Sequence, residues 1–248
     1  MSQGMNITDA SFQIASLRLT EDEVQLWRAD LEKLGPHESR WRELLSADER
    51  GRADRFHFVR DRQRFMASRA LLRTILAALL TDDPASLTFS YSETEKPFLA
   101  STHANSGITF NVSHSGGIAL YAFARHREVG VDVEQVRRDI EVEPIARRFF
   151  SVFEQGQLFA LPEEDRNEAF FRCWTRKEAY IKAVGKGLSI PLSQFDVSLG
   201  AVETNALLAT RLDKAEAAAW MLQEVPAGAG YRAALCVRGQ NWKLKHWC

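Results

Sequence analysis

The chain has few cysteines, and none of them stands in a disulfide or metal-binding pattern. Its 248 residues include three cysteines, Cys173, Cys236 and Cys248, with no CxxC spacing. An odd and widely spaced set argues against both a disulfide framework and a cysteine-ligated zinc site. This usage fits a protein of a reducing compartment.

Long apolar runs are also missing. The most apolar stretch, residues 70–80, is interrupted by Arg73, and the first twelve residues lack a basic stretch followed by an apolar core. A membrane-spanning helix needs about 20 predominantly apolar residues, and a secretory leader needs such a core. We therefore expect a cytoplasmic protein with no membrane partner.

Several catalytic and nucleotide-binding motifs are absent as well. Neither GxGxxG nor GxxxxGK[ST] occurs, and no serine, cysteine or histidine follows a recognisable triad order. Dinucleotide enzymes, P-loop NTPases and nucleophilic hydrolases therefore have no support.

The composition is that of an ordinary globular protein, with one local charge bias. Hydrophobic residues make up 45% of the chain, charged residues 26%, and the net charge is −1. The length allows one large domain or two of about 125 residues. Ten arginines fall between residues 40 and 73, against five acids. This local basic excess favours a phosphate-bearing or acidic partner.

Near the N-terminus, the pattern predicts a strand followed by a helix. Residues 12–19 have the composition of a strand. The next apolar residues recur at helical spacing before Gly35 and Pro36. They are Val24, Trp27, Leu31 and Leu34. We expect residues 24–34 to form a helix.

The rest of the chain alternates between helical and extended patterns. Ser-x-x-Glu capping boxes at Ser46 and Ser151 each begin a short helix. Helical patterns follow at 60–80, 144–150 and 164–184. In the helix expected at 60–80, the buried stripe consists of Phe65, Leu72, Leu76 and Leu79. Its borders carry Arg62, Arg64, Arg69 and Arg73. Strands are expected at 87–91, 108–112, 118–124, 129–134, 195–199, 220–225, 231–237 and 242–247. The two halves are alike in content, which permits two comparable α+β lobes, residues 1–126 and 127–248.

Two carboxylates interrupt the β-branched run at residues 129–134 (VGVDVE). In a strand, Asp132 and Glu134 point to one face, and Val129, Val131 and Val133 to the other. Paired carboxylates repel each other unless a cation lies between them, and oxygen ligands suit Mg²⁺ or Mn²⁺. A surface strand carrying two solvated acids has the same pattern.

Two further stretches carry candidate chemistry. Trp174, Glu178 and Lys182 lie four residues apart on one helix face, although Glu178 and Lys182 also form an ordinary helical ion pair. Residues 111–117 (NVSHSGG) combine small polar side chains, a histidine and glycine amides. This composition suits oxyanion binding, and a hairpin turn needs much the same residues.

Taken together, three motifs resemble the Sfp-type 4′-phosphopantetheinyl transferases. They are residues 111–114 (NVSH), 129–134 (VGVDVE) and 174–187 (WTRKEAYIKAVGKG), the last being the most specific. The likeness extends more loosely over residues 46–199. It implies an α+β fold of two similar lobes related by a pseudo-twofold axis, each a mainly antiparallel sheet with helices. The active site would lie at the join.

The resemblance also implies roles for individual residues. It assigns Mg²⁺, or Mn²⁺, to Asp132, Glu134 and Glu178, and coenzyme A to Arg52, Lys96, Ser113, His114 and Lys182, with Lys177 as a weaker candidate. Arg52 and Lys96 would contact the nucleotide end, and Lys182 a phosphate. One position departs from the family, which usually has glycine before Lys-Pro, where this chain has Glu95.

The implied reaction is transfer of the phosphopantetheine arm from coenzyme A to a serine of an apo acyl or peptidyl carrier protein, releasing adenosine 3′,5′-bisphosphate. Glu178 or a water on the metal would accept the serine proton. A Mg²⁺-dependent phosphohydrolase could use the same acids. An RNA-binding module would use the arginine-rich segment. However, the chain shows no basic region interleaved with exposed aromatics, which such modules need for base stacking. We expect a monomer with no nucleic-acid partner.

Overall fold

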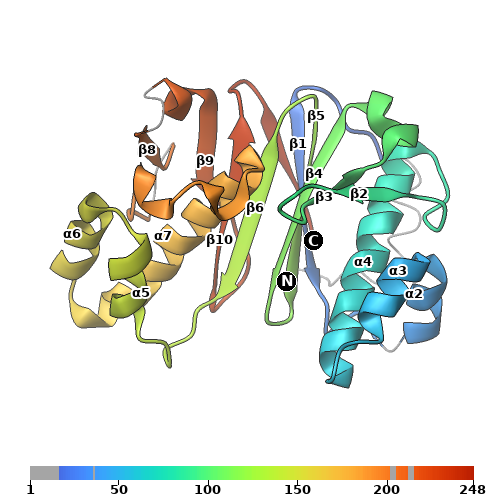
Figure 1. The fold of residues 1–248 in the computed structure, drawn as a ribbon, viewed down its shortest axis with the longest axis horizontal. Helices are drawn as coiled ribbons and strands as arrows, with labels where there is room; N and C mark the ends of the chain where they lie inside the picture. The colour runs from blue at the N-terminus through green and yellow to red at the C-terminus, as the bar shows by residue number, and fades with distance from the viewer. Residues whose placement is uncertain (1–16, 36, 202–204, 212–214) are drawn as a thin grey trace.

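Two β-sheets lie face to face at the centre of the molecule, and helices cover their outer faces (Figure 1). The computed structural model describes residues 17–248 except 36, 202–204 and 212–214. Helix α4 (Val59–Leu80) covers one sheet and α7 (Glu163–Val184) covers the other. No helix in this part of the chain is long and apolar enough to span a bilayer.

The first sheet, here called the N-terminal sheet, has the strand order β11-β1-β5-β4. These strands are β1 (Glu23–Asp30), β4 (Ile108–Ser115), β5 (Ile118–Arg125) and β11 (Lys243–Trp247). The β1–β5 and β5–β4 pairs are antiparallel, whereas β11 runs parallel to β1. The last strand of the chain therefore completes the sheet that the first described strand begins.

The second sheet, here called the C-terminal sheet, is antiparallel with the order β6-β10-β9. Its strands are β6 (Val129–Gln135), β9 (Trp220–Glu224) and β10 (Tyr231–Arg238). Two short ribbons lie outside the sheets. They pair β2 (Phe89–Tyr91) with β3 (Pro97–Leu99), and β7 (Phe195–Val197) with β8 (Leu207–Thr210).

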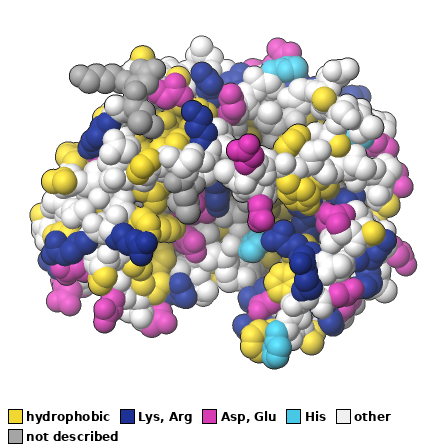
Figure 2. All heavy atoms as spheres, viewed as in Figure 1, with side chains coloured by type: hydrophobic (Ala, Val, Ile, Leu, Met, Phe, Trp, Pro, Cys, Tyr) yellow, Lys and Arg dark blue, Asp and Glu magenta, His cyan; other side chains and the backbone are white. Residues whose placement is uncertain are grey.

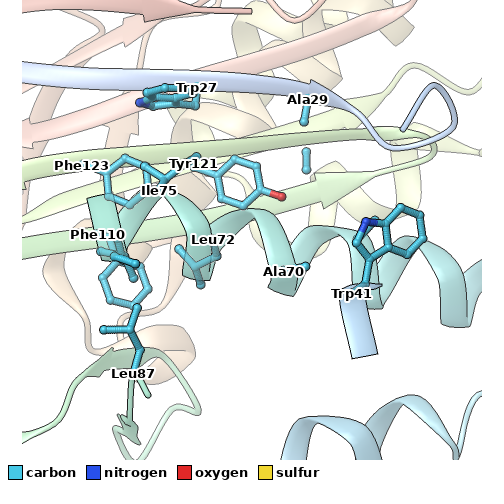
Figure 3. Packing of buried hydrophobic residues seen from close by; sticks show 14 of the residues in the cluster. Trp27, Ala29, Trp41, Ala70, Leu72, Ile75, Leu87, Phe110, Tyr121 and Phe123 are labelled. Carbon is cyan, nitrogen blue, oxygen red and sulfur yellow. The ribbon is translucent and has the colours of Figure 1, made fainter. Parts of the chain in front are cut away.

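Three apolar layers hold the stack together. The first lies between α4 and the N-terminal sheet, where Leu72 and Ile75 of the helix face Tyr121 and Phe123 of β5 (Figure 3). The second fills the space between the sheets and includes Val24, Leu26, Leu120, Val131 and Leu235. The third packs α7 on the C-terminal sheet and includes Phe170, Ile181, Leu222 and Cys236.

The helix predicted for residues 24–34 is wrong, because most of this segment is β1. Strand β1 is central to its sheet and buried on both faces: Leu26 packs between the sheets, and Trp27 packs toward α4. Because apolar residues lie on both faces of β1, its period of two is hidden. Two of them, Val24 and Trp27, fell by chance at helical spacing with Leu31 and Leu34, which follow the strand. Of the strand predicted at 12–19, residues 12–16 lie outside the described part, and residues 17–19 have no regular structure.

The other predicted helices are confirmed. Besides α4 and α7 they are α3 (Ala47–Ala53), α5 (Val142–Phe149) and α6 (Val152–Ala160), and the eight predicted strands other than 12–19 all contain strand residues. A short helix, α2 (Glu38–Leu44), was not predicted.

Both capping boxes are present, and the glutamate of each is buried against a cation from the long helix of its own half. Glu49 accepts hydrogen bonds from Ser46 N (3.1 Å) and Arg73 Nε (2.6 Å), and both charged side chains are at most 2% exposed. Arg69 also pairs with Glu49. Two of the four arginines expected along the border of α4 are therefore structural groups rather than a solvated basic face.

The same arrangement recurs in the second half. Glu154 caps α6 through Ser151 N (2.8 Å) and pairs with Lys177 of α7 at 2.7 Å, where neither side chain is exposed. Lys177 Nζ also donates to the carbonyls of Leu192 and Phe195. In each half, a capping glutamate thus joins a short helix to the long helix beside it.

Gly130 sets the distance between β6 and α7. A Cβ atom at this position would lie 2.2 Å from Ala179 O and 2.3 Å from Ala183 N, both backbone atoms of α7. No side chain can move to relieve such a contact. The close approach of the strand to the helix therefore requires glycine.

We expect Gly130→Ala to lower the free energy of unfolding by about 1–3 kcal/mol, because the strand and helix must separate to admit the methyl group. Gly156→Ala in α6 is the matched control, since no atom lies within 4 Å of its added Cβ. It should be neutral or stabilising by up to about 1 kcal/mol. Urea unfolding of both variants measures the difference, and equal stabilities would contradict the packing argument.

Candidate active site

The two sheets are joined at β4 and β6 by side chains instead of a backbone ladder. Each strand is at an edge of its own sheet. The backbone amides of Val131, Val133 and Gln135 donate to side-chain oxygens of Asn111 (2.8 Å), Ser113 (3.3 Å) and Ser115 (3.1 Å), respectively. Partners advance by two residues in both strands, so β4 and β6 run in the same direction. Polar side chains of β4 thus satisfy one edge of β6.

The same serine hydroxyls hold the two carboxylates of β6. Ser113 Oγ donates to Asp132 Oδ1 (2.8 Å), and Ser115 Oγ donates to Glu134 Oε2 (2.7 Å). Asp132 and Glu134 share one face, as expected, while the valines pack between the sheets. The acids are not solvated as in a surface strand, because Asp132 is only 3% exposed.

Helix α7 adds a third carboxylate and a cation to this face. Lys182 Nζ donates to Asp132 Oδ1 (2.5 Å) and to Ser113 Oγ (3.1 Å). Burial, followed by repulsion from Asp132 and Glu134, raises the pKa of Glu178 despite the nearby Lys182. Burial and Asp132 likewise raise the pKa of Glu134. The structure therefore brings together Ser113, Asp132, Glu134, Glu178 and Lys182.

This cluster has the donor chemistry of a divalent-cation site. One carboxylate oxygen, Asp132 Oδ2, is buried without a hydrogen-bond partner, and the pKa values of Glu134 and Glu178 are raised by burial and, to a smaller extent, by repulsion among the acids. A hard cation would relieve both conditions. In the described ranges, however, no three histidine, cysteine or acidic side chains are already arranged to hold a metal. The residues fit a metal in charge and ligand type but do not form a closed cage.

A cavity of about 630 Å³ opens beside the cluster and gathers cationic side chains. Its lining includes three arginines, Arg52, Arg64 and Arg69, together with His114 and two acids, Asp61 and Glu95. Loss of surrounding water, together with Lys182, Arg52 and Arg64, lowers the pKa of His114. Figure 2 shows dark-blue Lys and Arg side chains in the right half, next to the hollow between the two halves. Arg64 pairs with Glu32 and Arg69 with Glu49, so Arg52 is the arginine of this lining for which the described residues show no carboxylate partner.

A second cavity, of about 500 Å³, lies on the α7 side and is lined by Glu178, Lys182 and Asn111. The turn between β2 and β3 borders both cavities, since Glu95 and Pro97 line each of them. Lys96 lies between these residues, and its Nζ donates to Val129 O (3.3 Å) and Lys182 O (2.6 Å). Its ammonium thus binds backbone carbonyls of the other half of the molecule.

Two expectations near the site are modified by the structure. Lys177 is fully buried in its pair with Glu154, so this weaker candidate cannot contact coenzyme A. Glu95 has φ = 59°, the left-handed conformation that glycine adopts freely. The turn before Lys96 and Pro97 therefore has the backbone conformation typical of glycine, and Glu95 is strained in it.

Sequence reasoning did not assign a role to Asn111 or Ser115. Together with Ser113 they occupy every second position of β4. The residues of β6 that donate to them, Val131 and Gln135, also lie an even number of positions apart. This period of two is visible in the sequence. Its meaning was not, because the partner strand could be identified only from the fold.

Comparison with known proteins identifies the family of this chain. A sequence model described as "4'-phosphopantetheinyl transferase superfamily" matches residues 128–236, and one described as "4'-phosphopantetheinyl transferase, N-terminal" matches residues 32–126. The 4′-phosphopantetheinyl transferase HetI of Nostoc is 40% identical over 94% of both chains. The transferase Sfp of Bacillus subtilis is 34% identical over 64% of this chain and 69% of its own.

A solved structure with similarity is the holo-[acyl-carrier-protein] synthase of Thermotoga maritima. It is 21% identical, covers 46% of this chain and 63% of its own, and has a TM-score of 0.36. The fold is α+β, and the site joins carboxylates, hydroxyls and a lysine beside an arginine-lined cavity. The chain belongs to the 4′-phosphopantetheinyl transferase superfamily and is similar to the Sfp and HetI proteins. Its activity is 4′-phosphopantetheinyl transfer.

Burial of the Glu178 carboxylate, together with repulsion from Asp132 and Glu134, should appear as a pH-dependent loss of stability. The pKa of Glu178 is raised above its ordinary value of 4.5, so the folded state holds this proton more tightly than the unfolded state. The resulting stability is present at acidic pH and is lost as the pH rises through the raised pKa. Without divalent metal, Glu178→Gln should therefore raise the Tm at pH 7 and change it little near pH 4.

The Tm should rise by about 2–4 °C for each kcal/mol that the substitution adds to the free energy of unfolding. Glu43→Gln, at an exposed position of α2, is the control and should leave the Tm unchanged at both pH values. Differential scanning calorimetry checks both. A Glu178→Gln protein that is no more stable than the wild type at pH 7 would contradict the inferred cost of the charged Glu178 carboxylate.

Proposed function

We propose that this enzyme transfers 4′-phosphopantetheine from coenzyme A to a serine hydroxyl of an apo acyl or peptidyl carrier protein and releases adenosine 3′,5′-bisphosphate. The supporting observation is the meeting of Ser113, Asp132 and Lys182 within 2.5–3.1 Å at the junction of the two sheets. Beside them lies the cationic cavity. A metal-binding acidic cluster next to an anion site suits a substrate that reacts at a pyrophosphate.

Coenzyme A would occupy the cationic cavity with its nucleotide end. The volume of about 630 Å³ is in the usual range for a small-molecule site. Arg52 lines it, and no carboxylate partner for Arg52 is found among the described residues. We assign Arg52 and His114 to the nucleotide phosphate, and Ser113 and Lys182 to the pyrophosphate. Direct contact by Lys96 with the nucleotide stays a prediction.

Asp132, Glu134 and Glu178 would hold Mg²⁺, with Mn²⁺ as the alternative ion. When bound, the metal would neutralise negative charge on the pyrophosphate as the reaction proceeds. Because the acids do not form a closed cage, metal binding requires these side chains to reorient. The salt bridge between Lys182 and Asp132 must also yield or share its oxygen.

The residues of the chain would divide the chemical work as follows. The carrier serine oxygen attacks the phosphorus that bears the pantetheine arm, and the bond from this phosphorus to the bridging oxygen breaks. Glu178 would accept the serine proton as the general base. Lys182 and His114 stabilise the charge that leaves with adenosine 3′,5′-bisphosphate.

We also propose two similar lobes, residues 1–126 and 127–248, related by a pseudo-twofold axis. The two family matches end and begin at residues 126 and 128, which supports the boundary. The repeated capping devices, Glu49 with Arg73 and Glu154 with Lys177, support the similarity. Strand β11 departs from this division, because residues 243–247 lie in the N-terminal sheet. One chain supplies both sides of the site, which supports a monomer.

The metal assignment predicts a large loss of rate without loss of the fold. Asp132→Asn should lower kcat at least about a hundredfold, roughly 2.7 kcal/mol, since a metal ligand acts in the transition state. The assay measures the phosphopantetheine mass added to a panel of apo-carriers with coenzyme A and Mg²⁺. Glu163→Gln, at the exposed start of α7, should be silent. Near-normal turnover of folded Asp132→Asn would refute the assignment, and phosphate release without a carrier would indicate a phosphohydrolase.

The coenzyme A assignment predicts a ligand-dependent gain in stability. At about a hundred times its Kd, coenzyme A should add about 2.7 kcal/mol to the free energy of unfolding. Arg52→Ala and His114→Ala should reduce the thermal shift, whereas Arg55→Ala, exposed and outside the cavity lining, should keep it. Dephospho-coenzyme A should give a smaller shift than coenzyme A. Equal shifts would contradict phosphate recognition at the nucleotide end.

A further inference from the structure

The turn between β2 and β3 caps the C-terminus of α7 from the other half of the molecule. The last four carbonyls of a helix have no partner within it. In α7, Ile181 O accepts from Gly185 N, and Lys182 O accepts from Lys96 Nζ at 2.6 Å. Thr94 Oγ1 also donates to Gly185 O at 3.4 Å. Two side chains of one turn therefore bind the end of the helix that carries Glu178 and Lys182.

Lys96 connects this helix end to β6 as well. Its second hydrogen bond goes to Val129 O (3.3 Å), at the start of the strand that bears Asp132 and Glu134. A single ammonium thus bridges the C-terminal end of α7 and the first residue of β6. A cation at a helix C-terminus also interacts favourably with the helix dipole.

Lys182 is consequently held at both ends by the N-terminal half. Lys96 binds its main-chain carbonyl, and Ser113 binds its ammonium. Burial lowers the pKa of Lys96 to about 8, since its ammonium has exchanged water for two carbonyls. An ammonium has three donors, and two of them are used here. Both hydrogen bonds go to main-chain carbonyls of the C-terminal half, so they hold the ammonium at the junction of β6 and α7.

The turn itself is built to place Lys96. Ser92 N donates to Lys96 O (3.0 Å), Glu95 N donates to Ser92 O (2.9 Å), and Lys96 N donates to Ser92 Oγ (3.1 Å). The backbone of Glu95 adopts the left-handed conformation that closes the turn. Strain of this kind persists where the surrounding contacts fix the geometry.

We infer that Lys96 is a positioning residue for the transferase, which fixes the last turn of α7 against β6 and so aligns Lys182 and Glu178 with Asp132. This role rests on the proposed function of the acidic cluster. It differs from direct contact with the nucleotide, because Lys96 then acts on coenzyme A through Lys182 rather than by touching it.

Lys96→Met keeps the apolar stem and removes the ammonium. We expect amide hydrogen exchange in residues 182–186 to rise about tenfold or more, because the cap of the last turn is lost. Turnover at saturating coenzyme A and carrier should fall about tenfold, while the KM for coenzyme A and the preference over dephospho-coenzyme A stay within about twofold. Lys186→Met, at an exposed lysine just after α7, should change none of these quantities.

A direct phosphate contact predicts the opposite pattern. In that case the KM for coenzyme A would rise about tenfold, selectivity against dephospho-coenzyme A would collapse, and exchange in α7 would stay unchanged. That result, or unchanged exchange alone, overturns the proposal. Hydrogen exchange is measured on the free protein, so it tests the cap even if no carrier is modified, an outcome that would refute the proposed function instead.

Thr94→Val provides a second variant if Lys96→Met fails to fold. It removes the other hydrogen bond to the helix end without changing any charge. Exchange in the same segment should rise by a smaller factor, and turnover should fall with an unchanged KM for coenzyme A. A Thr94→Val protein with wild-type exchange and turnover would count against a cap formed by this turn.

Discussion

The active site depends on how one polar edge of a strand is satisfied between two sheets. β6 has β10 as a backbone partner on one side and no strand of the C-terminal sheet on the other. Buried amides left without acceptors are costly, and here Asn111, Ser113 and Ser115 of β4 accept from them. Because these side chains alternate along β4, they fix the register of the two halves. The same register places serine hydroxyls on Asp132 and Glu134.

Gly130 extends this constraint to the third layer. The β-branched residues of β6 fill the space between the sheets, so its opposite face must accommodate both the acids and a helix. The missing side chain at Gly130 lets α7 approach the strand backbone. Glu178 and Lys182 are therefore brought close to Asp132. Burial of Glu178 beside these acids raises its pKa despite the attraction of Lys182, and perturbed pKa values of this kind are common at functional sites.

Not every charged residue in a recognisable motif serves the chemistry. Lys177 stands next to Glu178 in the most specific motif, yet it pairs with buried Glu154 and binds two carbonyls. Arg73 has the equivalent position in the first half, paired with Glu49. Neighbouring helix positions point about 100° apart, so Lys177 faces the core while Glu178 faces β6. Proximity in sequence does not imply a shared role on a helix.

The sequence alone determined the elements whose signals are local. Capping boxes, the long helices, the alternating strand of Val129–Gln135 and the pairing of its two acids on one face follow from spacing and side-chain chemistry, and they are confirmed. The family followed from three motifs that the comparisons bear out. Local periodicity failed at β1, because a strand buried on both faces has no polar side to mark its period.

Only the tertiary structure decided which of these elements meet. Four features were decided in this way: the burial of Asp132, the role of Lys177, the return of β11 to the first sheet and the contact of Lys96 with Lys182. Each depends on contacts between residues that lie far apart in the chain or on different faces of an element. Such contacts are set by register and packing between layers, which depend on many residues at once. No short stretch of sequence carries that information, because the same lysine or serine serves equally well in a turn, a cap or a site until its partner is fixed in space.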